Sequence, residues 1–276
     1  MKVISANKIR NTVADLCIRA NLFLRKDVLA QLKAAYAREK KKGAKDILGA
    51  IIQNASLAKK ERLAICQDTG IPCVFIEIGQ EVRISGDLKK AIAQGVELGY
   101  KKGFLRNSII KDPLLRVKPG YSPAVIHIDI IKGDRFRLSV LPKGFGCENK
   151  TQLRMFNPTA QLAEIKKFII EAVESAGPDA CPPYIVGVGI GGTADYACFL
   201  AKKALLRKLG ARSSELTALE RELLLAINNL NIGPMGLGGR TTALGVNIET
   251  HPTHIAGLPV AVNISCHALR SASIGI

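Results

Sequence analysis

The stretch that decides the fold is Tyr184-Ile185-Val186-Gly187-Val188-Gly189-Ile190-Gly191-Gly192. Its apolar residues predict a short strand over 184–188, and the pattern that follows predicts a helix over 193–208. The glycines have the G-x-G-x-x-G spacing of dinucleotide-binding sites, which also need a second strand ending in Asp or Glu roughly 20 residues later. A helical pattern over 213–229 stands there instead. We therefore interpret the glycines as residues that let the backbone approach a helix N-terminus closely.

Helical patterns precede this stretch. Apolar residues at helical spacing predict three helices within residues 1–60, and a fourth helix over 87–103 has an acidic start and a Lys101-Lys102-Gly103 end. A further helix is predicted to start at Pro158 and to end at Gly177.

Strand patterns lie among these helices and follow them. The β-like segments are 73–78, 124–131, 135–141, 243–248 and 258–264. Residues 124–131 and 135–141 flank Lys132-Gly133-Asp134 and predict a hairpin. The chain is therefore predicted to be α/β, of the α+β type, with a helical N-terminal part, a mixed or antiparallel sheet surrounded by helices, and loops that carry its cysteines.

The composition is that of a globular protein, with 47% apolar residues and no tryptophan. The N-terminus lacks a signal-peptide pattern and every apolar run is too short to span a membrane, so we expect a cytoplasmic protein without a membrane partner. The formal charge of +17 favours an anionic partner. The densest basic run, Arg38-Glu39-Lys40-Lys41-Lys42, is typical of a helix end, and no nucleic-acid-binding motif accompanies it, so we expect no nucleic-acid partner.

Seven cysteines are present, and an odd number in a reducing compartment argues against a disulfide framework. Three fall on apolar helix or strand patterns and are predicted to pack in the core: Cys17, Cys73 and Cys198. Cys66, Cys181 and Cys266 lie in loop contexts, without a local Cys-x-x-Cys motif, so the fold would have to bring them together. Three thiolates without an obvious fourth suggest an iron–sulfur cluster with one open iron, which can act as a Lewis acid on substrate oxygen.

Several less common motifs occur in order along nearly the whole chain. They are Ile65-Cys66-Gln67-Asp68-Thr69-Gly70, Phe104-Leu105-Arg106, the Gly144–Lys150 loop with its Glu148-Asn149-Lys150 end, Ala180-Cys181-Pro182-Pro183-Tyr184, Gly191-Gly192-Thr193 and the tail from His254 to Cys266. In these motifs the chain resembles the α subunit of class I fumarate hydratase and its relative L-tartrate dehydratase. The resemblance implies an oxygen-sensitive hydro-lyase with a [4Fe-4S] cluster, in which Cys66, Cys181 and Cys266 hold three irons and the fourth iron binds substrate.

The resemblance also implies roles for residues beside the cysteines. Substrate contacts fall on Gln67, Arg106, Gly144 and Gly146, and acid–base roles fall on Asp68 and His254. A guanidinium suits a dicarboxylate, and a carboxylate or imidazole can move a proton. Two of these roles have a structural alternative: Asp68 can stabilise an Asx turn, and Arg106 can form a surface ion pair. The His251-Pro252-Thr253-His254 stretch lacks the helical register of a metal-binding pair, so we predict at most one catalytic imidazole there.

Two departures from the family pattern affect the expected assembly. Cys147 replaces a small or hydroxyl residue, which leaves open whether an additional thiol lies near the site. Single-chain relatives continue into a C-terminal domain, whereas this sequence ends soon after Cys266. We therefore expect residues 1–276 to form a single large domain equivalent to the N-terminal domain of those relatives. A β subunit would complete the site, and a heterotetramer of two α and two β subunits is compatible with this expectation.

The resemblance implies a reaction, and two alternatives stay open. The implied reaction is the hydration of fumarate to L-malate. Dehydration of L-tartrate to oxaloacetate is the alternative within the family. A non-catalytic iron–sulfur or nucleotide-binding module is the alternative from a different class, although it explains fewer of the residues.

Overall fold

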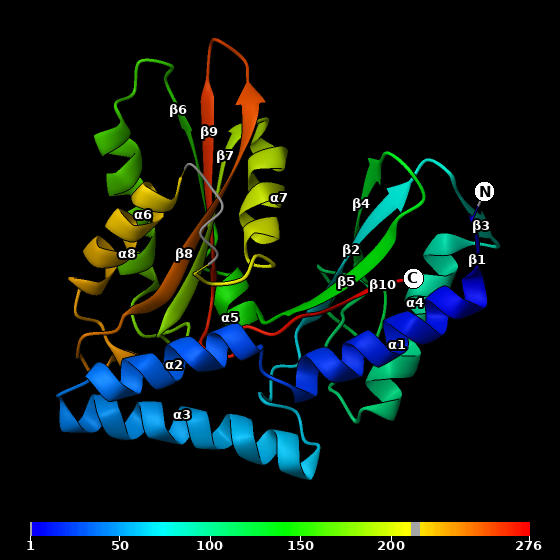
Figure 1. Ribbon diagram of the computed structural model, residues 1–276, viewed down its shortest axis with the longest axis horizontal. Coiled ribbons are helices and arrows are strands. Elements are labelled where there is room, and N and C mark those ends of the chain that lie inside the picture. The colour runs from blue at the N-terminus through cyan, green and yellow to red at the C-terminus, as the bar shows by residue number, and fades with distance from the viewer. Residues whose placement is uncertain (1, 211–215) are drawn as a thin grey trace. The chain divides into compact units, whose positions relative to one another are not determined.

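The computed structural model describes residues 2–210 and 216–276, and Figure 1 shows how their helices and strands are connected. The chain divides into two compact units. Unit 1 consists of Met1–Leu24, Leu57–Phe145 and Arg270–Ile276, and unit 2 consists of Arg25–Ser56 and Gly146–Leu269. Neither unit is one continuous segment of the chain. A single domain over residues 1–276 remains a prediction.

Helices and strands are interspersed along the chain after a helical N-terminal part. Their bounds are β1 (Lys2–Ser5), α1 (Ala6–Leu22), α2 (Lys26–Arg38), α3 (Lys42–Glu61), β2 (Ile71–Gly79), β3 (Val82–Ser85), α4 (Leu88–Lys102), β4 (Val125–Ile131), β5 (Phe136–Lys143), α5 (Phe145–Glu148), β6 (Gln152–Phe156), α6 (Leu162–Ala176), β7 (Tyr184–Gly192), α7 (Ala194–Ala204), α8 (Thr217–Asn228), the 3-10 turn η1 (Pro234–Gly236), β8 (Ala243–Thr253), β9 (Leu258–Ser265) and β10 (Ala272–Gly275). The three predicted N-terminal helices and the predicted α+β fold class are confirmed.

Unit 1 is built around a four-stranded sheet with the strand order β10-β5-β2-β4, beside a separate parallel pair of β1 and β3. β2 pairs in parallel with β4 and antiparallel with β5, so the predicted mixed sheet is confirmed. α1 and α4 pack on one face of this sheet (Figure 1), where their apolar residues share a core with Val74, Ile76 and Leu138. The Asp87 side chain accepts a hydrogen bond from the Lys90 N–H and caps α4 at its predicted start.

The predicted hairpin between residues 124–131 and 135–141 is wrong, although both strands exist as β4 and β5. β2 lies between them and pairs with each. β2 is buried along most of its length, and a strand buried on both faces is stable in the interior of a sheet. The connection from β4 to β5 therefore crosses the end of β2, where the Gly79 N–H donates to the Arg135 carbonyl (2.7 Å). A Cβ at Gly79 would lie 2.1 Å from the Gly133 carbonyl oxygen, so this crossing needs a glycine.

Unit 2 contains a second four-stranded sheet, with the order β6-β9-β7-β8 and helices on both faces (Figure 1). Alternate residues of its strands point to opposite faces. Val186 and Val188 of β7 share the larger core with apolar residues of α6 and α8. On the other face Ala197 and Ala201 of α7 pack against Ala261 of β9. The sheet is therefore sandwiched between α7 and the α6–α8 pair.

The glycines of β7 allow α7 to lie directly on the sheet. A Cβ at Gly187 would meet the Ala201 carbonyl oxygen at 2.1 Å, and a Cβ at Gly189 would meet the Ala197 carbonyl oxygen at 2.1 Å. The interpretation of close backbone approach is confirmed, but these two glycines face the side of a helix and lie inside a strand. The predicted end of this strand at residue 188 is wrong, because β7 continues to Gly192 before α7 begins.

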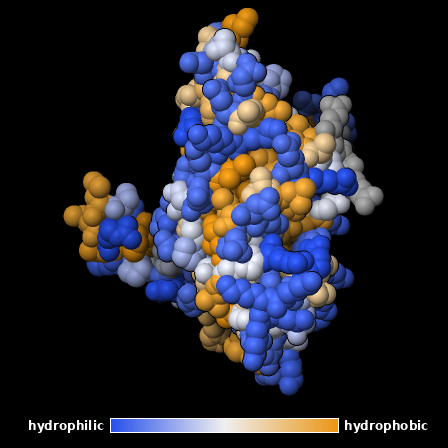
Figure 2. Space-filling view, turned by 90° about the vertical axis from the view of Figure 1, so that its left-hand side faces the viewer, coloured by the Kyte–Doolittle hydropathy of each residue, from blue (hydrophilic) through white to orange (hydrophobic). Residues whose placement is uncertain are grey.

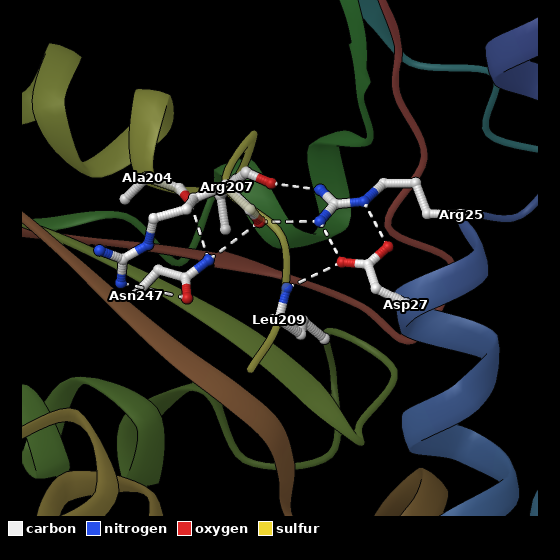
Figure 3. Close-up of polar contacts among 7 residues, drawn as sticks. Arg25, Asp27, Ala204, Arg207, Leu209 and Asn247 are labelled. Carbon is white, nitrogen blue, oxygen red and sulfur yellow. Dashed lines mark hydrogen bonds and ion pairs between the residues drawn. The ribbon is translucent and has the colours of Figure 1, made fainter. Parts of the chain in front are cut away.

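An ion pair and its hydrogen bonds attach α2 to the segment that follows α7 (Figure 3). The Arg25 Nε donates to the Asp27 carboxylate (3.0 Å), and its other nitrogens donate to the carbonyls of Leu205 (2.6 Å) and Arg207 (2.7 Å). The Asp27 carboxylate also accepts from the Leu209 N–H (2.8 Å). Burial alone would raise the pKa of Asp27, but the hydrogen bonds from Arg25 and Leu209 outweigh burial and lower that pKa below its ordinary value.

Two predicted helix starts differ from the structure or lie partly outside it. α6 begins at Leu162 rather than at Pro158, because the Glu164 carboxylate accepts the Gln161 N–H (3.1 Å) and caps the helix there. Its end before Gly177 is confirmed. The helix predicted over 213–229 is α8, and positions 213–215 lie outside the described residues.

Hydrophobic side chains gather over α6 and α8 on the face of the molecule that Figure 2 shows. Between these helices lies an open groove of about 440 Å³, lined by Ala163, Lys166, Lys167, Ile170, Glu171, Glu174, Glu222, Leu223 and Ala226. None of the candidate site residues lines this groove. Within residues 2–210 and 216–276, no helix is both long enough and apolar enough to cross a membrane.

Candidate active site

The Cys66–Gly70 segment is an irregular loop between α3 and β2 in unit 1, and its backbone is held from several sides. The Tyr100 hydroxyl donates to the carbonyls of Thr69 (2.8 Å) and Gly70 (3.1 Å). Burial raises the pKa of Tyr100, so this hydroxyl keeps its proton at neutral pH. The Thr69 hydroxyl accepts from the Arg106 N–H (3.0 Å). These bonds give the loop a fixed conformation, which a site needs to orient its side chains.

The Asp68 carboxylate is held by two backbone N–H groups. Its Oδ1 accepts from Gly70 N–H (2.9 Å), which is the Asx turn considered as the alternative role of this residue. Its Oδ2 accepts from Phe145 N–H (2.8 Å). A Cβ at Gly144 would lie only 3.2 Å from Oδ2, so a glycine there leaves room for the carboxylate. Asp68 and Gly144 are therefore neighbours in unit 1.

Gln67 and Arg106 present exposed side chains beside the same loop. The Cys66 Sγ lies 3.4 Å from the Gln67 Oε1, and Cys66 is partly exposed. The backbone bond to Thr69 holds the Arg106 segment against the loop. One edge of unit 1 thus presents a thiol, an amide, a carboxylate and a guanidinium, which can bind a metal centre and a carboxylate ligand.

Cys181 and Cys266 lie in two loops of unit 2 that are joined through His267. The Cys181 carbonyl accepts from the His267 backbone N–H (3.4 Å) and lies 3.0 Å from the His267 Nδ1. A carbonyl only accepts, so this contact requires a proton on Nδ1. Cys181 has a φ of 59°, a conformation that residues with a side chain rarely adopt and that clusters at functional sites.

Cys147 lies on α5, and α5 is anchored by a polar cluster. Cys147 is buried, and its Sγ donates to the Ala180 carbonyl (3.3 Å) beside Cys181. The Glu148 carboxylate pairs with Lys202 of α7 (2.5 Å) and accepts from the Asn263 amide (3.0 Å). Cys147 is therefore close to the Cys181 loop as a packed hydrogen-bond donor. Gly146, also on α5, is exposed in unit 2.

His254 lies at the opposite end of β9 from Cys266. It is exposed in the turn between β8 and β9, and its Nδ1 accepts from the Ala256 N–H (3.2 Å). Cys266 follows the last residue of β9. A strand from Leu258 to Ser265 is about 23 Å long at the usual rise per residue. Unit 2 therefore does not place the His254 side chain next to Cys266 of the same chain.

The residues fit an iron–sulfur cluster in their chemistry. Three cysteines lie partly exposed in loops, and thiolates are the ligands such clusters require: Cys66, Cys181 and Cys266. Cys17 and Cys73 are fully buried in a helix and a strand, so the prediction that they pack in the core is confirmed. Burial raises the pKa of the Cys17 thiol, which disfavours a thiolate there. Cys198 packs against the small α7 cluster and is partly buried.

The three candidate ligands are divided between the units. Cys66 belongs to unit 1, and Cys181 and Cys266 belong to unit 2. In the part of the chain that the structure describes, no three His, Cys, Asp or Glu side chains form a group that could hold a metal ion. Each unit by itself thus supplies fewer than three of the thiols.

Sequence patterns did not identify three polar residues that contact the candidate site segments. His267 bonds Cys181, Lys202 pairs with Glu148, and Arg270 donates through its Nη2 to the Asp68 carbonyl. The proximity of His267 to Cys266 in sequence is the signal that could have suggested it. Lys202 and Arg270 make contacts between positions far apart in the chain, which no local pattern contains.

Known proteins resemble this chain over nearly all of its length. The family model described as fumarate hydratase (Fumerase) matches residues 10–275. A protein of Methanocaldococcus jannaschii with the provisional name L(+)-tartrate dehydratase subunit alpha is 42% identical over 275 residues, which is 96% of this chain and 96% of that protein. The L(+)-tartrate dehydratase subunit alpha of Escherichia coli (strain K12) is 30% identical over 276 residues, which is 98% of this chain and 91% of that protein.

The family match includes every motif on which the resemblance was based, from the Cys66 loop to Cys266. The relatives named above are matched over more than nine-tenths of their own length, so the similarity is not confined to one shared segment. The chain belongs to the fumarate hydratase (Fumerase) family of hydro-lyases, as an α-subunit type.

Proposed function

We propose that this chain is the α subunit of a [4Fe-4S] hydro-lyase that interconverts fumarate and L-malate together with a β subunit in the cytoplasm. The observation that carries the proposal is the fixed loop of unit 1. It presents Cys66, Gln67 and Asp68 side by side, with Arg106 held against it through Thr69. Family membership and the joined loops of Cys181 and Cys266 support the same proposal.

Cys66, Cys181 and Cys266 would hold the cluster. When bound, the cluster would supply a Lewis acid for a substrate oxygen. The exposed guanidinium of Arg106 would bind a substrate carboxylate through two parallel hydrogen bonds. Gln67 and the backbone at Gly144 and Gly146 would contribute further substrate contacts.

Asp68 would move the proton during hydration and dehydration. Its carboxylate is held by N–H groups from Gly70 and Phe145, so its oxygens are fixed in place. A fixed carboxylate within reach of substrate carbon or oxygen can accept or return a proton without first reorganising.

The position of His254 sets a condition on its proposed role. Because β9 separates it from Cys266 within unit 2, His254 would act at the cluster of a second α chain. An assembly with two α and two β subunits would supply that second chain. His254 would then be the acid–base group that one α chain contributes to the other.

A β subunit would complete the site. The homologues in other organisms are named as subunits alpha, which supports a partner of a different sequence. The formal charge of +17 would favour both an acidic partner surface and the approach of a doubly anionic substrate.

L-Tartrate is the second candidate substrate. The names of the M. jannaschii and E. coli homologues favour it, whereas the description of the family model favours fumarate. Both substrates are four-carbon dicarboxylates, so the roles of Arg106 and Asp68 would be the same for either.

Anaerobic reconstitution tests the proposal. The chain would be loaded with iron and sulfide, with and without the co-expressed β subunit, and assayed with fumarate, L-malate and L-tartrate. We expect cluster absorbance, and turnover of at least one substrate in the complex with β. A complex that carries the cluster but turns over none of these substrates would support the non-catalytic module instead.

A further inference from the structure

We infer that the segment Cys266-His267-Ala268-Leu269-Arg270 positions the other two candidate ligand loops, with His267 fixing the Cys181 loop and Arg270 fixing the Cys66 loop. The inference rests on the proposed cluster. It makes His267 and Arg270 positioning residues, because each acts on a backbone carbonyl rather than on substrate.

His267 holds Cys181 through two donors. Both its backbone N–H (3.4 Å) and its Nδ1–H (3.0 Å) point to the Cys181 carbonyl oxygen. Cys181 has a φ of 59°, which a residue with a Cβ keeps only when its surroundings enforce it. The next carbonyl, that of Pro182, accepts from the Met235 N–H (2.9 Å). The backbone that directs the Cys181 side chain is therefore held by His267 at the Cys181 carbonyl and by Met235 at the Pro182 carbonyl.

Arg270 holds the Cys66 loop through the Asp68 carbonyl. Arg270 is only 3% exposed, and its Nη2 donates to the Asp68 carbonyl. Together with the Tyr100 bonds, this ties the carbonyls of Asp68, Thr69 and Gly70, three consecutive residues. The backbone that carries Cys66 and the Asp68 carboxylate is thus fixed on its carbonyl side.

Arg270 has further side-chain donors that its contact with Asp68 does not use. Within residues 2–210 and 216–276, its buried Nε and Nη1 make no hydrogen bond. A buried cation with unsatisfied donors is costly, and an apolar residue would serve packing alone better. A positive charge under this loop favours an anionic group beside it, such as a thiolate-ligated cluster.

Both contacts originate in one short stretch that begins at the third candidate ligand. Cys266 is itself the first residue of the stretch, and its carbonyl accepts from the Leu269 N–H (3.0 Å) in a turn. Ala268 and Leu269 are buried, which anchors the stretch between the two polar contacts. The segment therefore carries one positioning side chain for a loop of unit 2, His267, and one for a loop of unit 1, Arg270.

The test uses matched variants of the full chain co-expressed with the β subunit. His267→Ala removes the side-chain donor, whereas His267→Asn offers an amide N–H to the same carbonyl. Arg270→Met removes the charge and donors, whereas Arg270→Lys keeps the charge. Arg207→Met is the control, because it removes another partly buried arginine, paired with Glu220, that touches no candidate ligand loop.

The readouts are iron and sulfide per chain after anaerobic reconstitution, and the rate at which a chelator removes iron. We expect His267→Ala and Arg270→Met to lose iron about ten- to hundredfold faster, as for other residues that orient metal ligands. His267→Asn is expected to restore a rate near that of the wild type, and Arg270→Lys an intermediate rate. Arg207→Met is expected to lower the melting temperature while its iron loss stays at the wild-type rate.

The outcomes separate the two proposals. A wild-type chain that takes up no cluster contradicts the proposed function. The positioning role alone is overturned if the wild-type chain takes up the cluster and the His267→Ala and Arg270→Met variants lose their iron as slowly as the wild type does. Melting temperatures of the cluster-free chains show whether a variant folds, and faster iron loss in Arg207→Met to the same extent would also overturn the inference.

Discussion

Asp68 combines a structural contact and a proposed chemical role in one carboxylate. Replacement by Asn keeps an amide oxygen that can accept from Gly70 N–H, but the amide nitrogen cannot accept from Phe145 N–H. We expect Asp68→Asn to keep the cluster absorbance and to lower kcat by about 10²- to 10⁴-fold, the usual contribution of a proton-transfer group. Anaerobic kinetics on the complex with the β subunit measure this.

Asp134→Asn is the matched control for that experiment. Asp134 is exposed in unit 1, in the connection between β4 and β5, and its replacement removes the same charge. Its kcat is expected to equal that of the wild type. Turnover by Asp68→Asn within a few-fold of the wild type would show that Asp68 only stabilises its turn.

At the residue level, the sequence could propose those candidate site residues that stand in contiguous motifs. Cys66, Gln67 and Asp68 are consecutive, so one loop carries them together. Arg270 could not be found in this way, because it contacts Asp68 across 202 positions of the chain. A lone arginine in a sequence gives no indication of which carbonyl it will reach.

At the level of elements, periodicity predicted which segments become helices and strands but not which strands pair. β4 and β5 were recognised, yet β2 lies between them because a strand buried on both faces takes an inner place in the sheet. Short strands such as β1 and β10 have too few residues for their alternation to stand out. The glycines of β7 match a phosphate-binding spacing, although two of them serve helix packing.

Replacing Gly189 by Ala tests that packing role. The new Cβ would lie 2.1 Å from the Ala197 carbonyl oxygen and 2.6 Å from the Ala201 nitrogen, both backbone atoms that cannot rotate away. We expect a loss of about 1–3 kcal/mol in the free energy of unfolding, as for other overpacked positions. Thermal and urea unfolding measure it.

Gly43→Ala provides the opposite expectation. Gly43 lies at the start of α3, and a Cβ there would meet nothing within 4 Å. Alanine favours the helix, so stability is expected to stay the same or to rise by up to about 1 kcal/mol. If Gly189→Ala were as stable as Gly43→Ala, the close approach of α7 to β7 would not require glycine.

The attachment of α2 predicts a specific pH dependence. The pKa of Asp27 is lowered in the folded chain, so its contribution is present above the unfolded value of about 3.9 and is lost as pH falls through the lower folded value. Asp27→Asn should therefore reduce the free energy of unfolding by about 1–3 kcal/mol at pH 7, and by progressively less below about pH 4. Urea unfolding across this pH range measures the difference.

Asp15→Asn is the control for the pH experiment. Asp15 is exposed on α1, so its replacement should change the free energy of unfolding little at any pH. A constant difference between the wild type and Asp27→Asn from pH 7 to below pH 4 would show that the Arg25–Asp27 pair makes no pH-dependent contribution.

At the level of the whole molecule, the chain would supply only part of the proposed site. Its thiols are divided between two units, and the β subunit and a second α chain would add the remaining groups. No property of a single sequence states which groups arrive from another chain. The structural observation that bears on this question is that β9 lies between His254 and Cys266 in unit 2.

A complementation experiment tests whether His254 acts between chains. Two differently tagged α chains, one with His254→Ala and one with Cys266→Ala, would be co-expressed with β, and mixed complexes would be isolated by sequential use of both tags. Each variant alone is expected to be inactive.

In the mixed complex, the His254→Ala chain brings three intact cysteines and the Cys266→Ala chain brings an intact imidazole. If His254 serves the other chain, one site per pair is complete, and about half of the wild-type activity should return, since half of the sites are restored. If His254 serves its own chain, no site is complete and the mixed complex should be as inactive as its parents.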